Sequence, residues 1–406
     1  MRVPPESSWR AEFHAIAEIR YPQFVRDGYH IIDSDTHVGP NAETLEMYAG
    51  PILRRRWDEL TQYYQAVTEG HHLSINPYPF KRQLRTGSVE QEATKGGKIP
   101  LRGNIALNWE VHPTAEVNNL NAAGRLEDMD REGVDVHLII PATFANAATV
   151  LDDEMALELY GAYHRYLHDY CSADARRLKG SILAAGVDPQ WSAARIRELA
   201  KEPWVAAVIP VLPEGMPLDD PALNPIWQAM DESDLPILHH SFFYEPPYFP
   251  GYRDIWGNLA IARAASHPWG AQRLLAYALL SGMFDEFPNL RIGFAECSSG
   301  WVAGWLNRLD YQQAYLSRTL PETKQTPTEY ARSGRVFCGV ELDEGEAITQ
   351  SVIDVIGDSV LMYSSDYPHG GCKYPKSPDV VLGWKGLGET TMRKLMSDNA
   401  ANYLRM

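Results

Sequence analysis

The sequence predicts an α/β fold, a (β/α)8 TIM barrel with a long insertion after the first strand. Short apolar, β-branched runs recur eight times with helical stretches between them, which is the pattern of a parallel sheet. The alternative is an open, doubly wound sheet. No G-x-G-x-x-G pattern follows the first run, which argues against the dinucleotide-binding version of that alternative.

The apolar runs have the length and the composition of buried strands. In chain order they are His30–Val38, Val134–Ala142, Leu178–Ala185, Val205–Pro213, Leu235–Ser241, Arg291–Ser298, Arg335–Glu341 and Val360–Pro368.

Helices are expected between these strands, since apolar residues recur there at helical spacing. The four clearest segments are Asp152–Ser172, Asp188–Leu199, Ile255–Phe284 and Met392–Leu404. Asp188 followed by proline is typical of a helix start, with the carboxylate as N-cap. We expect the third helix to be interrupted near Pro268, because proline lacks a backbone donor.

The domain organisation is expected to be one barrel, residues 30–406, after an N-terminal extension of residues 1–29. Residues 41–125 form an insertion far longer than a usual strand–helix connection. Its middle, Pro51–Ile105, holds nine Lys and Arg against five Asp and Glu. We interpret the insertion as a lid over the mouth of the barrel; the alternative is a solvated surface excursion.

The overall charge and composition exclude several classes of protein. A formal net charge of −16 argues against nucleic-acid binding, which needs a basic surface. A hydrophobic content of 45% argues against disorder. No apolar run is long enough to span a membrane or to act as a signal peptide. The four cysteines form no C-x-x-C pair, so a cytoplasmic location is expected.

Chemistry in such a barrel is located at the carboxyl ends of the strands. The first strand ends with Asp35 and His37, which face the same way because they are two residues apart. The fifth ends with His239 and His240, of which only one can point inward, and the sixth ends near Glu296.

The eighth strand adds Asp366 and His369, while Glu341, Asp343 and Tyr367 are lesser candidates for lining the pocket. A single histidine or aspartate at such a position is more often a core or capping residue. Several carboxylates from separate strands would repel one another unless a cation neutralised them. Their convergence therefore predicts a metal site.

The sequence resembles the amidohydrolase superfamily, in the branch called amidohydrolase family 2. The strand-end motifs that carry the resemblance are Asp35-x-His37, LPILHH, FPNLRIGFAE and SSDYPHG. Further matches are RLKGSILAAGVDPQ, LDDPALNPIWQAMDESDLPI, GWVAGWLNRLD and the terminal DNAANYL. The resemblance extends from about Ile31 to the end of the chain, without the insertion, and implies a TIM barrel with metal at the strand ends.

Carried over by position, the resemblance implies Asp35, His37, the fifth-strand histidine and Asp366 as metal ligands. The family spacing LPxxxH points to His240 as that histidine. Two-metal hydrolytic members commonly bridge their ions with a carboxylated lysine on the fourth strand, but VAAVIPVLP contains no lysine. Decarboxylase-like members usually have a histidine at the end of the sixth strand, where this sequence has Glu296.

Two classes of metalloenzyme fit this site, and the sequence favours a non-haem iron monooxygenase. Mixed histidine and carboxylate ligation suits iron that activates dioxygen. A subgroup that resembles this family and has glutamate on the sixth strand contains diiron monooxygenases. Glu296 and His369 would then hold or bridge a second iron, and with Asp366 they are the expected catalytic residues.

The alternative is a single zinc-type ion in a hydrolase of amides, esters or thioesters, or in a decarboxylase of aromatic acids. Such an ion lowers the pKa of a bound water molecule to about 7. Asp366 would be both ligand and general base, and Glu296 would orient a ligating histidine. A third reading is a metal-binding barrel without catalysis.

The expected partner is a small-molecule substrate. The basic insertion fits a phosphate-bearing substrate such as one linked to coenzyme A, because Arg and Lys pair well with phosphate. An oxygenase would also need an external electron donor. The family resemblance makes a homodimer a reasonable expectation.

Overall fold

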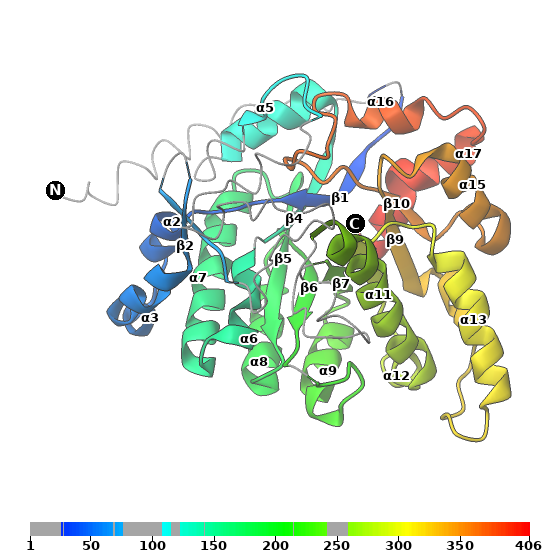
Figure 1. The fold of residues 1–406 in the computed structure, drawn as a ribbon, viewed down its shortest axis with the longest axis horizontal. Helices are drawn as coiled ribbons and strands as arrows, with labels where there is room; N and C mark the ends of the chain where they lie inside the picture. The colour runs from blue at the N-terminus through cyan, green and yellow to red at the C-terminus, as the bar shows by residue number, and fades with distance from the viewer. Residues whose placement is uncertain are drawn as a thin grey trace, which may run out of the picture.

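Eight parallel strands form the barrel, in the order β1-β4-β5-β6-β7-β8-β9-β10 (Figure 1). The computed structural model describes residues 26, 28–67, 70–75, 108–114, 122–141, 143–213, 215–241 and 259–406. The strands are β1 Ile32–His37, β4 Val136–Ile140, β5 Leu178–Ala185, β6 Val205–Val211, β7 Ile237–His240, β8 Ile292–Ala295, β9 Val336–Val340 and β10 Leu361–Tyr363. Each lies within one of the eight predicted runs, so the predicted fold is confirmed.

The barrel closes between its first and last strands. An isolated parallel bridge pairs Thr36 of β1 with Tyr367, just beyond β10. Most strands are buried along their length, because the barrel interior covers one face and the helices cover the other. The apolar composition of the runs follows from this double burial.

Helices surround the strands and form the outer layer (Figure 1). The principal ones are α7 Asp153–Cys171, α8 Pro189–Leu199, α9 Asn224–Glu232, α11 Leu259–Leu280, α13 Val302–Tyr315 and α15 Gly345–Ile356. Shorter ones are η4 Thr143–Asn146, α6 Ala147–Val150, η5 Pro221–Leu223, α12 Met283–Glu286, α14 Pro327–Tyr330, η6 Ala331–Arg335 and α16 Ser377–Leu382. None of the described helices combines the length and apolarity that a bilayer crossing requires.

The helix starts follow the sequence signals. The Asp188 carboxylate accepts a hydrogen bond of 2.9 Å from the backbone N–H of Trp191, so it caps α8 as predicted. The predicted interruption at Pro268 is wrong, because α11 runs through it. A proline inside a helix removes one backbone hydrogen bond, and neighbouring turns can hold the helix together. The C-terminal segment is helical in three pieces: α17 Glu389–Arg393, η7 Lys394–Asp398 and α18 Asn399–Leu404.

The described part of the insertion lies against the flank of the barrel. It contains α2 Ala42–Met47, α3 Pro51–Arg55, η1 Trp57–Tyr63, β2 Tyr64–Ala66, β3 His71–Leu73 and the beginning of α5 Ala122–Glu132. Helices α2 and α3 pack against α7 (Figure 1). Arg56 forms ion pairs with Glu59, Asp152 and Glu154, so this basic residue balances local acidic groups. Residues 68–69, 76–107 and 115–121 lie outside the described residues, and the lid stays a prediction.

Candidate metal centre

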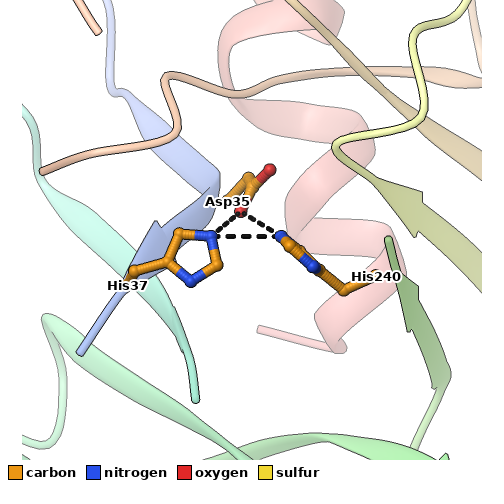
Figure 2. Close-up of side chains that lie close together, drawn as sticks. All are labelled: Asp35, His37 and His240. Carbon is orange, nitrogen blue, oxygen red and sulfur yellow. Dashed lines mark hydrogen bonds and ion pairs between the residues drawn. The ribbon is translucent and has the colours of Figure 1, made fainter. Parts of the chain in front are cut away.

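Four side chains converge at the carboxyl ends of β1, β7 and β10. Asp35 Oδ1 lies 3.2 Å from His37 Nε2 and 3.6 Å from His240 Nε2. The two Nε2 atoms are 3.1 Å apart (Figure 2). Asp366 Oδ1 lies 3.3 Å from His37 Nε2. Two donors that ligate one ion at about 2.1 Å lie about 3.0–3.4 Å apart, so these spacings are close to those of a coordination shell.

Ring orientation distinguishes the two adjacent histidines of β7. His240 Nδ1 lies 2.6 Å from the carbonyl oxygen of Ser241 and must donate to it, which leaves a lone pair on Nε2 for a metal. His239 points to the other side of the strand, where its ring contacts Phe294 edge-on and lies next to Gly270 of α11. The structure thus places His240, and not His239, in the cluster.

The Asp35 carboxylate carries the clearest sign of an expected cation. Its Oδ1 atom is buried and has no hydrogen-bond partner of acceptable geometry. A buried carboxylate oxygen without a donor is costly, and a metal ion would satisfy it. His37, His240 and Asp366 supply the other donors that zinc, manganese or iron use. The residues therefore fit a divalent metal ion.

The carboxylates of the cluster favour a positive charge beside Asp35, where a metal ion would bind. Burial alone would lower the pKa of His37, but the nearby carboxylates of Asp35 and Asp366 outweigh burial and raise the pKa to about 10. Burial opposes ionisation of both carboxyls too. Even so, His240 and His37 lower the pKa of Asp35, and His369 and His37 lower that of Asp366. Without a metal, a proton on His37 provides the positive charge that an ion would otherwise supply.

Two of the predicted site residues adopt the left-handed backbone conformation. Asp366 has φ 62° and Glu296 has φ 48°. Residues other than glycine adopt the left-handed backbone conformation at a cost of about 1–3 kcal/mol, and such residues cluster at functional sites. The Asp366 N–H donates to the Asp35 carbonyl at 3.0 Å, and the Asp366 carbonyl accepts from the His369 N–H at 2.8 Å. These bonds hold the Asp366 backbone in place.

Glu296 and His369 contact different members of the cluster. Glu296 Oε2 accepts from Ser241 Oγ at 2.8 Å and lies 3.4 Å from His240 Nε2. His369 Nδ1 lies 2.6 Å from Asp366 Oδ1, and its ring stacks on that of His37 with centroids 4.2 Å apart. Among the described residues, His37, Asp366 and His369 form one possible ligand group, and Asp35, His37 and His240 form the other. Glu296 belongs to neither, so its predicted second-metal role stays a prediction.

The structure places the three lesser candidates, Glu341, Asp343 and Tyr367, in different surroundings. Glu341 follows β9, and its Oε1 accepts from the Ser298 N–H at 2.7 Å. Burial and the charge of Glu296 raise the pKa of Glu341 to about 7. Asp343 is exposed and pairs with a surface lysine. The Tyr367 hydroxyl donates to Asp128 behind β10 and does not line the site.

Sequence reasoning missed the groups that support the ligands. Ser241 orients His240 through its carbonyl and Glu296 through its hydroxyl. Asp33 Oδ1 accepts from the N–H groups of Asp35 and Ser365. Arg125 donates to the carbonyl of His37. Ser241 and Asp33 could have been noticed as neighbours of the predicted ligands, but nothing in the sequence points to Arg125.

The fold and this cluster define a TIM-barrel protein with histidines and carboxylates at its strand ends, suited to a metal ion. Residues 32–406 match the family model described as amidohydrolase, of the family 2 type. The chain belongs to this family of enzymes. No protein of curated function matches the sequence.

Solved structures with a similar fold cover nearly the whole chain. One is 5-carboxyvanillate decarboxylase from Novosphingobium aromaticivorans with manganese and a nitrobenzoic acid bound, at 20% identity and TM-score 0.64, covering 94% of this chain and 98% of that one. An amidohydrolase from Mycobacterium avium subsp. paratuberculosis has 18% identity and TM-score 0.66, with 93% and 99% covered. A dihydroxybenzoic acid decarboxylase from Polaromonas, with manganese and 2-nitroresorcinol, has 15% identity and TM-score 0.60, with 93% and 97% covered.

Proposed function

We propose that this protein is a metal-dependent decarboxylase of aromatic carboxylic acids. The observation that carries the proposal is the possible ligand group Asp35, His37 and His240, with Asp35 Oδ1 lacking a donor. Asp366 Oδ1 lies beside this group, 3.3 Å from His37 Nε2. The decarboxylases of similar fold support this reaction class, which is the alternative that the sequence left open. The site suits one divalent ion of the manganese or zinc type.

Asp35, His37, His240 and Asp366 would hold the ion, which supplies a Lewis-acid charge that attracts and orients anionic oxygens of the substrate. Decarboxylation breaks a carbon–carbon bond and requires a proton at the carbon that loses carbon dioxide. Asp366 and His369 are placed to deliver it, because His369 Nδ1 lies 2.6 Å from Asp366 Oδ1. The His369 side chain is 44% exposed and can take a proton from solvent.

Glu296 has a separate role in this proposal. It is buried, is anchored by Ser241, and lies close to His240 Nε2. Its negative charge stabilises a cation in the cluster and disfavours a second anion on that side. We propose that the carboxylate of the substrate approaches from the side of Asp366 and His369.

The test is metal-dependent release of carbon dioxide from a panel of hydroxybenzoates, including 5-carboxyvanillate and 2,6-dihydroxybenzoate. We expect protein stripped of metal to be inactive and Mn²⁺ to restore activity. Asp366→Asn should lower kcat by about 10²–10⁴-fold, because it removes a proton-carrying group. Asp343→Asn is the matched control at an exposed carboxylate and should leave kcat unchanged. Full activity of Asp366→Asn, or none of the wild type on any aromatic acid, would contradict the proposal.

A second candidate, the iron monooxygenase favoured by the sequence, depends on Glu296. A carboxylate at the end of β8 adds a hard anionic ligand near His240, as a two-iron site requires. Such an enzyme would take an external electron donor and a substrate such as one linked to coenzyme A. Metal analysis of protein purified without added metal separates the candidates. About two irons per chain would favour the oxygenase, whereas one manganese or zinc would favour the decarboxylase or a hydrolase.

A further inference from the structure

Arg125 of helix α5 is a fully buried arginine behind the metal-binding end of β1. Its Nη2 donates to the carbonyl oxygen of His37, and its Nη1 lies 3.2 Å from the Thr36 hydroxyl. Nη1 also donates to His137 Nδ1 at 3.1 Å, and Nε donates to the Tyr170 hydroxyl at 3.1 Å. A guanidinium is costly to bury unless its donors are satisfied, so these four contacts hold it in one position.

The same helix also holds the segment that follows β10. The Arg125 guanidinium carbon lies 5.1 Å from the centroid of the Tyr367 ring, within the range of a cation–π contact. One turn further along α5, Asp128 accepts a hydrogen bond from the Tyr367 hydroxyl and another, of 2.7 Å, from the Tyr374 hydroxyl. Helix α5 therefore contacts β1 through Arg125, and the segment after β10 through both Arg125 and Asp128.

These two segments form the seam where the barrel closes. The His37 N–H donates to the Tyr367 carbonyl at 2.6 Å, and the Asp366 N–H donates to the Asp35 carbonyl at 3.0 Å. Three of the four ligands proposed for the metal lie on this seam: Asp35, His37 and Asp366. A shift of one segment along the other would change the spacing between their donor atoms.

We infer that Arg125 is a positioning residue for the metal centre, which sets the distance between the ligands of β1 and Asp366 by joining Thr36, His37 and Tyr367. This inference rests on the proposed function, since it assumes that the cluster binds a metal ion. The planar guanidinium donates to several acceptors at fixed angles, whereas a lysine ammonium is a compact group on a flexible stem. Lysine would keep the charge and lose the geometry.

The test compares Arg125→Lys with Arg291→Lys in the full-length protein. Arg291 is also fully buried, and it lies just before β8, at the opposite end of the barrel. Its guanidinium donates to the backbone carbonyls of Tyr403 and Asp234. We measure the Kd for Mn²⁺ and the visible spectrum of bound Co²⁺, whose bands depend on ligand geometry. We expect Arg125→Lys to weaken Mn²⁺ binding about 10–100-fold and to alter the Co²⁺ spectrum. Arg291→Lys should do neither, although both variants lose thermal stability.

Tyr367→Leu is the second variant, for the case in which Arg125→Lys does not fold. It removes the ring that lies over the guanidinium, and we expect a severalfold weaker Kd for Mn²⁺ and an altered Co²⁺ spectrum. Tyr367→Phe, which keeps the ring and removes only the bond to Asp128, should change both less. Wild-type Kd and spectrum in the folded variants would overturn the inference, as would equal effects of Arg125→Lys and Arg291→Lys. If the wild-type protein itself bound no divalent metal, the proposed function would fail first, which distinguishes the two failures.

Discussion

Histidine binds a metal ion through a neutral ring nitrogen, so the partner of its second nitrogen decides whether it can serve as a ligand. In His240 that partner is the carbonyl of the next residue, Ser241. The sequence pair His239-His240 offers two identical imidazoles, and the alternation of a strand sends them to opposite faces. Burial does not separate them, since both are nearly inaccessible.

The first prediction separates these two histidines. His240→Asn should lower the affinity for Mn²⁺ by at least about tenfold, because it removes a ligand. His239→Asn should lower the free energy of unfolding but keep one Mn²⁺ per chain, since its ring packs outside the cluster. Isothermal titration calorimetry measures the affinity and the stoichiometry of Mn²⁺ for both variants, and urea denaturation measures the free energy of unfolding. A lower stoichiometry for His239→Asn than for His240→Asn would reverse the assignment.

The second prediction concerns Glu132 at the end of α5. Burial raises its pKa to about 7, and its Oε2 atom has no hydrogen-bond partner. Because the folded-state pKa lies above the unfolded value of about 4.3, the folded protein binds more protons between these values and stability falls as pH rises. The loss between pH 4.5 and pH 7 is on the order of 3 kcal/mol.

Glu132→Gln should remove this dependence and keep the bond that Oε1 accepts from the Ser377 N–H. We expect the variant to be more stable than the wild type at pH 8 and to show a flatter profile of unfolding free energy from pH 5 to pH 8. Urea denaturation at each pH measures the free energy of unfolding. The control is Glu322→Gln at an exposed position. An unchanged slope for Glu132→Gln would contradict the prediction.

At the scale of elements, the distance between a strand and the helix packed on it decides how large a side chain can be at the contact. The space around two glycines shows this. A Cβ atom on Gly293 of β8 would lie 2.5 Å from the Tyr403 ring of α18, and the Tyr403 hydroxyl donates to the Ile237 carbonyl at 2.8 Å. Gly304 of α13 has open space around its Cα atom. The sequence does not show this difference, because it depends on the elements that pack around each glycine.

The third prediction follows from this contrast. Gly293→Ala should destabilise the protein by about 1–3 kcal/mol, because the ring of Tyr403 must move and its hydroxyl loses its acceptor. Gly304→Ala should stabilise it by about 0.5–1 kcal/mol, because alanine favours a helix interior. Chemical denaturation gives both values, and equal signs for the two variants would refute the argument.

Prediction of the elements from sequence succeeded where the signal is local. Each of the eight apolar runs contains one strand, and the Asp188 cap marks the start of α8. The prediction failed at Pro268, because packing of a long helix against the barrel can tolerate one missing hydrogen bond. Two of the runs extend well past their strands: β10 ends at Tyr363 although its run continues to Pro368, and β8 ends at Ala295 although its run continues to Ser298.

At the scale of the whole molecule, the candidate metal centre joins parts of the chain that are far apart. Its proposed ligands come from β1, β7 and the segment after β10, and two of these segments form the seam of the barrel. An ion that binds only the folded state stabilises it by mass action. The centre should therefore contribute to global stability as well as to chemistry.

The fourth prediction is that saturation with Mn²⁺ raises Tm. At a free concentration of about 100 times Kd the gain is about 2.7 kcal/mol, which corresponds to a rise of several degrees for a chain of this size. EDTA should reverse it. Asp35→Asn should show a clearly smaller rise at the same Mn²⁺ concentration, because it weakens the proposed ligand whose oxygen lacks a donor. Scanning calorimetry measures Tm, and an equal rise for Asp35→Asn would argue against this centre.

The sequence by itself determined the number and order of the strands and the polar residues at their ends, because periodicity and strand-end composition are local properties of the chain. It named the four proposed ligands only with the help of a family resemblance. The tertiary structure decided that His240 faces the cluster, that Glu296 contacts His240 whereas His369 contacts Asp366, and that Arg125 donates to the backbone of His37. The physical reason is that these relations depend on strand register, side-chain rotation and helix packing between segments distant in the sequence.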